Sequence, residues 1–215
     1  MTRRAFATLG AGRQSTLLRV SGPSFARYCQ RWGYDYFACS WPVDFSRPVA
    51  WSKIALLRAL LDSYDTVVWM DADAVIVDHG TDIGTETDNC HFLSLVEHEV
   101  EGKRNPNTGV VLLRSCDEAR DFLDQVWEKA EYLHHRWWEQ AAVMDVLGYD
   151  VDSGEIVGDS PHRSGVAWLS KRWNSIPDDP VRNPYVRHYP GWTVSRRLAY
   201  MTRDALRFRA GPPQT

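Results

Sequence analysis

The sequence predicts an α/β fold in which helices flank a central β-sheet. Apolar segments of strand length recur along the chain, and the longest of them runs from Thr66 to Val77. Residues 52–62 carry apolar side chains at helical spacing, and a short polar turn joins them directly to that strand. Helix-to-strand passages of this kind are typical of sheets built from α/β units. At 215 residues and without an evident linker, the chain is expected to form one domain.

The N-terminal part of the chain is expected to alternate strands, helices and loops. A strand is predicted over 4–9, a helix over 21–32, a strand over 34–39, a loop over 41–48 and a helix over 52–62. The loop follows from its two prolines, and each helix follows from apolar residues that recur on one side. Two strands and two helices are therefore expected before the long apolar strand.

The remaining two thirds of the chain include the clearest predicted helix, over 117–133, and the pattern weakens only after Gly148. The polar segment 78–89 is expected to be a surface connection, and the charged segment 97–107, which contains Pro106, is expected to be mobile. The segment 194–209 is basic, and 211–215 is expected to be a disordered tail. The predicted strands and helices of this part are, in order, 91–96, 108–114, 117–133, 137–147, 167–169 and 185–189, with a further short strand around Val151.

The long apolar strand delivers two aspartates, Asp71 and Asp73, near its carboxyl end. In open α/β sheets, ligands bind beyond the carboxyl ends of the strands. Because one residue separates them, both side chains point the same way if the backbone is extended. Two carboxylates aimed at one point supply half of a divalent-cation site, and such a cation can neutralise a diphosphate leaving group. The alternative is that both aspartates cap the next turn or are solvated.

Composition argues against several classes of protein. The formal net charge of −3 does not suit a general nucleic-acid-binding protein, which needs a basic surface. The first residues hold no apolar stretch of signal-peptide length, and no run of about 18 apolar residues occurs, so a cytoplasmic location is expected. The four cysteines show no metal-binding spacing and are expected to be reduced packing residues.

A series of motifs extends from about residue 50 to residue 192. In chain order they are Lys53, Tyr64-Asp65, Trp69-Met70-Asp71-Ala72-Asp73, Asn107-Thr108-Gly109-Val110, Trp138-Glu139-Gln140, Trp173-Asn174 and His188-Tyr189-Pro190-Gly191. Each motif is weak by itself, but their order and spacing resemble a family of glycosyltransferases with a D-x-D motif. That family comprises the retaining galactosyl-, xylosyl- and mannosyltransferases of yeast mannan and plant xyloglucan synthesis. The chain is also similar to the glycogenin-like transferases.

The resemblance implies the nucleotide-sugar-binding fold called type A, a Rossmann-like mixed sheet flanked by helices, in a single domain over 1–210. It implies a Mn²⁺ or Mg²⁺ cofactor held by Asp71, Asp73 and His188, although a lone histidine there could equally be a surface residue. It also implies a UDP- or GDP-sugar as donor. The donor-binding residues that it indicates are Asp71, Ala72, Asp73, Asn107, Gly109 and Gly191.

The resemblance further implies sugar transfer to a hydroxyl acceptor with retention of anomeric configuration. Lys53 is expected to assist the diphosphate, and Glu139 or Gln140 to steady the anomeric centre, through a covalent intermediate or during front-face attack. Alternatively, Lys53 is an ordinary solvated residue of its helix, and Glu139 only reflects the preference of glutamate for the first turn of a helix. One or two of four tryptophans are expected to line the sugar subsites while the others pack in the core: Trp137, Trp138, Trp173 and Trp192.

Two other functions stay open from the sequence. A haloacid-dehalogenase-like phosphohydrolase would use Asp71 as nucleophile, Asp73 as acid/base and Asp178-Asp179 as a second acidic pair, but that family begins with its aspartate strand. A non-catalytic sugar-nucleotide or glycan-binding protein is the other alternative. The acceptor could be a glycan, protein, lipid or small molecule. The basic segment 194–209 is either a peripheral contact with an anionic membrane or a solvated helix face.

Overall fold

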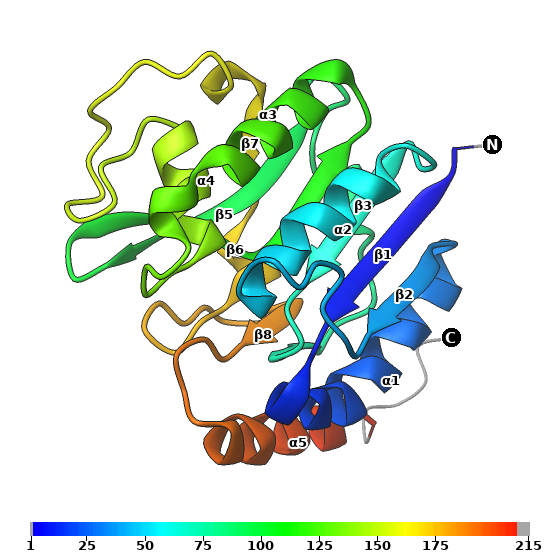
Figure 1. The fold of residues 1–215 in the computed structure, drawn as a ribbon. Helices are drawn as coiled ribbons and strands as arrows, with labels where there is room; N and C mark the ends of the chain where they lie inside the picture. Colours follow the sequence, from blue (N-terminus) through cyan, green and yellow to red (C-terminus); the bar gives the residue numbers. More distant parts are fainter. Residues whose placement is uncertain (1, 210–215) are drawn as a thin grey trace.

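The structure, a computed structural model, describes residues 2–209. Its strands are β1 (Arg4–Leu9), β2 (Asp35–Cys39), β3 (Thr66–Met70), β4 (Ala74–Ile76), β5 (Leu93–Val100), β6 (Lys103–Arg114), β7 (Val166–Trp168) and β8 (Val186–His188). Six of them form one sheet in the order β2-β1-β3-β6-β5-β7 (Figure 1). β1, β2 and β3 are parallel, and β6 is antiparallel to both of its neighbours, so the sheet is mixed as predicted.

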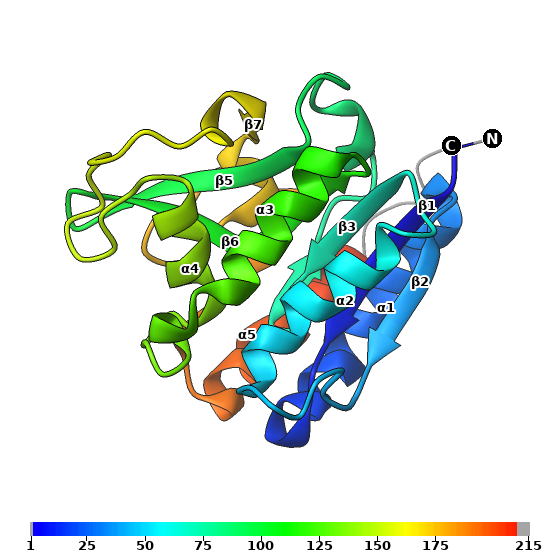
Figure 2. The same cartoon turned by 45° about the horizontal axis from the view of Figure 1, so that its top comes forward.

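Helices cover both faces of this sheet. They are α1 (Ser15–Trp32), α2 (Ser52–Leu60), α3 (Asp117–Glu128), α4 (Glu139–Val146) and α5 (Val194–Arg209). Figure 2 shows α2, α3 and α4 on one face of the sheet, where they enclose one hydrophobic core. α1 encloses the core on the opposite face, and α5 packs beside α1 and against β4. The α/β fold class predicted from the sequence is confirmed.

β3 lies in the middle of the sheet because both of its faces are apolar. Val67 and Trp69 point into the core under α2, whereas Val68 and Met70 point into the core under α1. Successive side chains of a strand alternate between faces, so a strand covered on both sides needs a continuous apolar run. This run ends at Met70, and the chain then leaves the sheet with Asp71.

A second, small sheet follows directly. β4 pairs with β8 in antiparallel orientation, and Ala74 lies opposite His188 in the register. Residues far apart in the sequence are thereby brought to the carboxyl end of β3. The backbone reinforces this junction, because the Tyr189 amide donates to the Asp73 carbonyl over 3.1 Å.

The segment 97–107, predicted to be mobile, forms most of a β-hairpin instead. β5 and β6 pair up to Val100 and Lys103, and the turn residues Glu101 and Gly102 both have positive φ, of 54° and 75°. Such a turn matches the twist of the flanking strands. Pro106 is accommodated beside a register shift of the ladder, because a proline cannot donate to a regular one.

Other predicted boundaries differ in smaller ways. The strands at 4–9 and 34–39 are confirmed, but the first helix begins at Ser15, earlier than predicted, and continues through Pro23. The helix predicted over 117–133 ends at Glu128, and no strand forms around Val151. The predicted disordered tail, 211–215, lies outside the described residues. Within 2–209, no helix is long and apolar enough to span a membrane.

Candidate functional site

Asp71 and Asp73 lie in a turn between β3 and β4, not on the extended backbone that the sequence predicts. The Ala74 amide donates to the Asp71 carbonyl over 3.0 Å, which closes the turn. The turn forms because the chain must leave the central sheet at Met70 and enter the small one at Ala74. Both carboxylates nevertheless face the same partner, His188: its Nε2 lies 3.3 Å from Asp73 Oδ1 and 3.8 Å from Asp71 Oδ2.

These three side chains form a cluster that can hold a metal ion. One ligand atom from each of Asp71, Asp73 and His188 lies within 4.8 Å of the other two. Carboxylate oxygens with one imidazole nitrogen suit Mn²⁺ and Mg²⁺, whose remaining positions are open to phosphate oxygens and water. The chemistry of the donor set therefore fits the ion that the sequence led us to expect.

The two aspartates have different surroundings. Asp73 is buried, and its second oxygen lies 3.3 Å from Nε of Arg197, which reaches in from α5. Burial would raise the pKa of Asp73, but His188 and Arg197 outweigh it and hold that pKa below its ordinary value. Asp71 is more exposed, and the indole of Trp69 donates to its Oδ1 over 2.6 Å. Asp73 is thus an ionised carboxylate in a fixed position.

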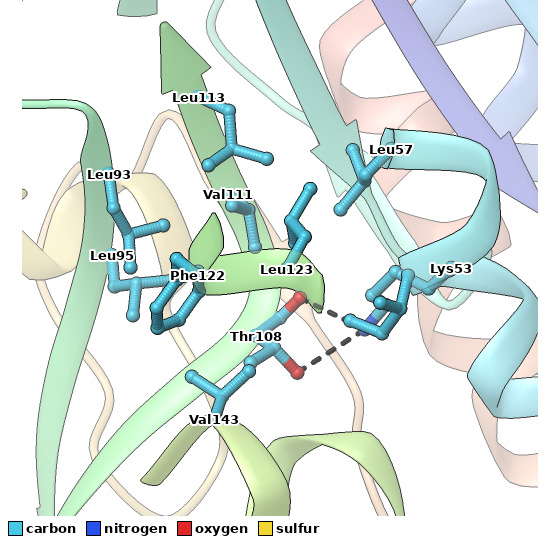
Figure 3. A pocket seen from close by; sticks show the side chains of 11 residues that line it. Lys53, Leu57, Leu93, Leu95, Thr108, Val111, Leu113, Phe122, Leu123 and Val143 are labelled. Atoms are coloured by element: carbon cyan, nitrogen blue, oxygen red, sulfur yellow. Dashed lines mark hydrogen bonds between the residues drawn. The ribbon is translucent and has the colours of Figure 1, made fainter. Parts of the chain in front are cut away.

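Lys53 lies next to this cluster and is buried, so it is not the solvated helix lysine of the alternative interpretation. From α2 its Nζ reaches Asp71 Oδ1 at 3.0 Å and Glu139 Oε1 at 2.7 Å. It also donates to the carbonyl of Thr108 at 3.1 Å and lies 3.3 Å from its hydroxyl (Figure 3). The stem of Lys53 borders a small apolar pocket between the sheet and the helices, and only the ammonium reaches the polar site.

The ion pair of Lys53 and Glu139 is shielded from water. Burial would lower the pKa of Lys53, but Asp71 and Glu139 raise it above its ordinary value. Burial raises the pKa of Glu139, although Lys53 counteracts it. Oε2 of Glu139 has no hydrogen-bond partner within the part of the chain that the structure describes. The pair is therefore held by mutual attraction inside the protein, where each partner depends on the other.

A cleft of about 850 Å³ opens over these residues. It falls within the size range of small-molecule and cofactor sites. All predicted site residues line it except Gly109, which lies beneath the His188 ring. The Gln140 amide donates to Asn105 Oδ1 over 2.9 Å and accepts from the Thr108 amide over 3.3 Å, so it is fixed in the cleft wall.

Two of the four tryptophans singled out in the sequence line the cleft. Trp137 and Trp138 line the cleft, and Trp138 has an unusual backbone conformation, with φ of +44°. Trp173 is fully buried in the core, and Trp192 packs against Tyr189. Trp138 is 46% exposed and has the more open indole, whereas the Arg136 guanidinium lies 4.5 Å from the ring centroid of Trp137.

Comparison with known proteins identifies the family. Residues 26–170 match the model of the nucleotide-diphospho-sugar transferase family. The chain belongs to this family. "Probable xyloglucan 6-xylosyltransferase 1" of Oryza sativa subsp. indica is 30% identical to it over 105 residues. That match covers 45% of this chain and 23% of the rice protein, so the chain spans about a quarter of the curated relative's length.

Solved structures identify the fold as that of type A glycosyltransferases. A glycosyltransferase involved in glycosylation of the major capsid of PBCV-1 superposes with a TM-score of 0.67 at 18% identity, covering 93% of this chain and 99% of the other. The galactosyltransferase LgtC, solved with donor and acceptor sugar analogs, gives a TM-score of 0.57 at 15% identity, covering 97% and 98%. At such identities the likeness concerns the fold.

Because the chain belongs to a family of nucleotide-diphospho-sugar transferases, the phosphohydrolase alternative is excluded. The geometry agrees with this, because Asp179, one of its proposed second acidic pair, is engaged elsewhere. Its Oδ2 lies 2.6 Å from Lys171 Nζ and 3.0 Å from His98 Nδ1. Only Asp178 of that pair lines the cleft.

Three residues that touch the cluster have no predicted site role: Trp69, Asn174 and Arg197. Trp69 precedes Asp71 by two positions, and that spacing on a strand could have revealed it. Asn174 belongs to the motif Trp173-Asn174, for which no role was predicted. Its Oδ1 lies 2.9 Å from His188 Nδ1. Arg197 was assigned to the basic C-terminal segment, and no local signal distinguishes it from the other arginines there.

Proposed function

We propose that the protein is a metal-dependent, retaining glycosyltransferase that moves a sugar from a nucleotide-diphosphate donor to a hydroxyl acceptor. The observation that carries the proposal is the convergence of Asp71, Asp73 and His188 in the wall of a large cleft, beside the buried Lys53. Family membership supports a nucleotide-sugar donor. Retention is proposed from the resemblance that the motifs carry.

In this proposal Asp71, Asp73 and His188 hold Mn²⁺ or Mg²⁺, and the bound ion supplies positive charge to a diphosphate leaving group. The protein's own part is to fix the three ligands before substrate arrives. The Trp69 indole orients Asp71, and Asn174 contacts the far side of the His188 ring. Ligands held in this way lose little entropy on binding an ion.

Two basic residues of the protein add to the positive charge of the cleft wall. Arg197 contacts Asp73 and has further N–H groups that can donate to phosphate oxygens of the donor. Lys53 contributes its charge through Asp71, because its three N–H groups face Asp71, Glu139 and the Thr108 carbonyl. Glu139 already pairs with Lys53, so we assign it the role of holding the ammonium in place. We assign to Gln140, whose amide lies in the cleft wall, the role of steadying the anomeric centre during front-face attack.

The acceptor is proposed to stack on Trp137 and Trp138, whose indoles line the cleft. A saccharide is the acceptor class best suited to flat aromatic surfaces, because they match the C–H faces of sugars. A glycan acceptor also agrees with the names of the relatives, one a xyloglucan xylosyltransferase and another a galactosyltransferase solved with acceptor sugar analogs. Protein, lipid and small-molecule acceptors belong in the same screen.

A thermal-shift panel tests the donor and the metal together. UDP, GDP and their common sugar conjugates are each measured with Mn²⁺ and with EDTA. A ligand at 100 times its dissociation constant adds about 2.7 kcal/mol to the free energy of unfolding, which gives a clear rise in Tm. We expect one nucleotide to raise Tm with Mn²⁺ and not with EDTA. No rise with any nucleotide would refute the proposal.

Turnover separates a transferase from a binding protein that lacks activity. The stabilising sugar nucleotide is incubated with Mn²⁺ and panels of oligosaccharide, peptide, lipid and small-molecule acceptors, and release of the nucleoside diphosphate is measured. We expect release that depends on the acceptor, and a product whose anomeric configuration equals that of the donor by NMR. Donor binding without release would identify the non-catalytic alternative.

Peripheral membrane contact is a further part of the proposal. α5 exposes Arg196 and Arg207, whereas its one acidic residue, Asp204, is buried. Each basic residue near an anionic surface contributes about 1 kcal/mol of attraction. Co-sedimentation is expected with vesicles that contain phosphatidylserine and not with phosphatidylcholine alone. Equal behaviour with both would contradict membrane contact and favour a solvated helix face. A cytoplasmic location stays a prediction.

A further inference from the structure

A buried chain of hydrogen bonds runs from the backbone of β6 to the ring of His188. The Gly109 amide lies 2.9 Å from Asn107 Oδ1, and Asn174 Nδ2 lies 2.8 Å from the same oxygen. Asn174 Oδ1 in turn lies 2.9 Å from His188 Nδ1. Asn107, Asn174 and His188 are at most 6% exposed, so water does not compete for these groups.

The first hydrogen bond, from the Gly109 amide, fixes which atom donates and which accepts in each of the following ones. A backbone N–H can only donate, so the atom of Asn107 that faces Gly109 must be its carbonyl oxygen. The atom of Asn174 that faces this oxygen must then be the amide nitrogen. The oxygen of Asn174 consequently faces His188, where it can only accept. Nδ1 of His188 must therefore carry a proton.

We propose that Asn107 and Asn174 form a relay that keeps a proton on Nδ1 of His188, so that the neutral form of the ring is the Nδ1–H tautomer and Nε2 is the nitrogen that faces Asp71 and Asp73. This inference extends the proposed function, and it rests on His188 being a metal ligand in that proposal. Nε2 lies 3.3 Å from Asp73 Oδ1 and 3.8 Å from Asp71 Oδ2. In this tautomer three acceptor atoms converge without a hydrogen between them, which is the arrangement that a cation needs.

Without the relay, the opposite tautomer would be favoured. Asp73 Oδ1 lies close enough to accept a hydrogen bond from an Nε2–H group. That bond would place a proton where the ion has to bind. Asn107 and Asn174 are thus positioning residues, which act on the metal through His188.

The backbone of β6 also limits the movement of the ring. A Cβ at position 109 would lie 2.2 Å from Cε1 and 2.5 Å from Nδ1 of His188, so the ring packs directly on the glycine backbone. The ring thus has a backbone surface on one side and an asparagine oxygen at Nδ1. The orientation of the ring is therefore limited by β6, and the tautomer is set by Asn107 of the same strand acting through Asn174.

The tautomer can be measured without a metal. Protein labelled with ¹⁵N-histidine is treated with EDTA in mildly alkaline buffer, and long-range ¹⁵N–¹H spectra are recorded, with His188 assigned through His188→Gln. We expect an Nδ1–H pattern in the natural sequence and in Asn174→Asp, which keeps an acceptor for Nδ1. We expect Asn174→Leu, which removes that acceptor, to shift the population to Nε2–H. An Nε2–H pattern in the natural sequence overturns the relay, even if Asn174→Leu does not fold.

Metal affinity is the second readout. Free Mn²⁺ is measured by EPR in titrations of the same variants, with circular dichroism to verify folding. Removing an outer hydrogen-bond partner typically weakens metal binding by 10- to 100-fold, and we expect this for Asn174→Leu, with a smaller loss for Asn174→Asp. Unchanged affinity in folded Asn174→Leu overturns the positioning role. If the Nδ1–H tautomer is found but no variant binds Mn²⁺, the relay stands and the proposed function fails.

Discussion

At the scale of single residues, the site depends on charges that are held in place before any ligand arrives. Asp73 is buried between His188 and Arg197, and Lys53 is buried between Asp71 and Glu139. Burying a charge is costly unless partners surround it, so each of these groups stabilises its neighbours as well as preparing the cleft. Substitutions of these residues are therefore expected to change both the free energy of unfolding and ligand binding, and the two effects can be measured separately.

Asp73→Asn tests whether the carboxylate serves ligand binding. The amide cannot replace the charge toward a cation, so we expect the Mn²⁺-dependent rise in Tm with nucleotide to disappear. Loss of the ion-pair contacts with His188 and Arg197 should cost roughly 1–3 kcal/mol of unfolding free energy, and we expect the protein to stay folded. Asp78→Asn, at a half-buried aspartate in a local turn, is the matched control and should behave like the natural sequence. If Asp73→Asn kept the full Mn²⁺ response, the aspartate would be structural.

Lys53→Met and Glu139→Gln test the buried ion pair. Lys53→Met leaves a carboxylate buried without its cation, so we expect a loss of about 3–5 kcal/mol in urea unfolding. The double variant has no unpaired charge at Glu139 and should lose less than the sum of the single losses, by at least about 1 kcal/mol. Additive losses would show that the two groups do not stabilise each other.

At the scale of elements, β6 contributes most to the site. Its first half forms the hairpin wall of the cleft, and Asn107, Thr108 and Gly109 then pass directly under the metal cluster. Gly109 is needed because the His188 ring occupies the space of a side chain. One strand therefore sets the shape of the cleft and the position of a ligand.

Gly109→Ala should push the His188 ring away from the aspartates. We expect a loss of about 1–3 kcal/mol from overpacking and weaker Mn²⁺ binding in the EPR titration. Gly22→Ala, inside α1, is the control, because its nearest neighbour lies 3.6 Å from the new Cβ. There we expect only a small change in the free energy of unfolding, because the helix preference of alanine is opposed by the restriction on a residue that precedes a proline, here Pro23. Equal effects of both substitutions would contradict the close contact at Gly109.

The sequence predicted those elements and residues whose signals are local. β1, β2 and the apolar part of β3 follow from their own side chains, and the proximity of Asp71, Asp73 and His188 follows from motifs whose order is informative. The hairpin at 97–107 was missed because the charged residues and Pro106 indicate a loop, whereas the pairing of β5 with β6 decides the conformation. Arg197 was missed because only the packing of α5 against β4 brings it to Asp73.

At the scale of the whole molecule, stability should depend on pH through buried histidines. Burial lowers the pKa of His98, although Asp179 counteracts it, and burial also lowers the pKa of His79. Both histidines then bind protons more weakly in the folded than in the unfolded chain. Their contribution to stability is therefore present above an unfolded pKa of about 6.5 and is lost as pH falls below it.

We expect urea unfolding to give a lower free energy at pH 5.5 than at pH 7.5. Each group contributes at most about 1.4 kcal/mol per pH unit. His98→Gln cannot bind a proton and should reduce the slope of stability against pH, whatever it does to stability at pH 7.5. His134→Gln, which replaces an exposed histidine, should leave that slope unchanged. If His98→Gln left the slope unaltered, other groups would cause the acid sensitivity.

The pairing of β4 with β8 has a consequence for biosynthesis. A growing chain presents Asp71 and Asp73 long before it presents His188, because the two strands that unite them are made at different times. During translation the aspartates are two carboxylates without an imidazole partner, and the Arg197 side of the site is also absent. A chain that ends before β8 lacks both His188 and Arg197, so the complete cluster forms only after these later segments have been made. Under the proposed function, cation binding would therefore report that β8 and α5 have docked.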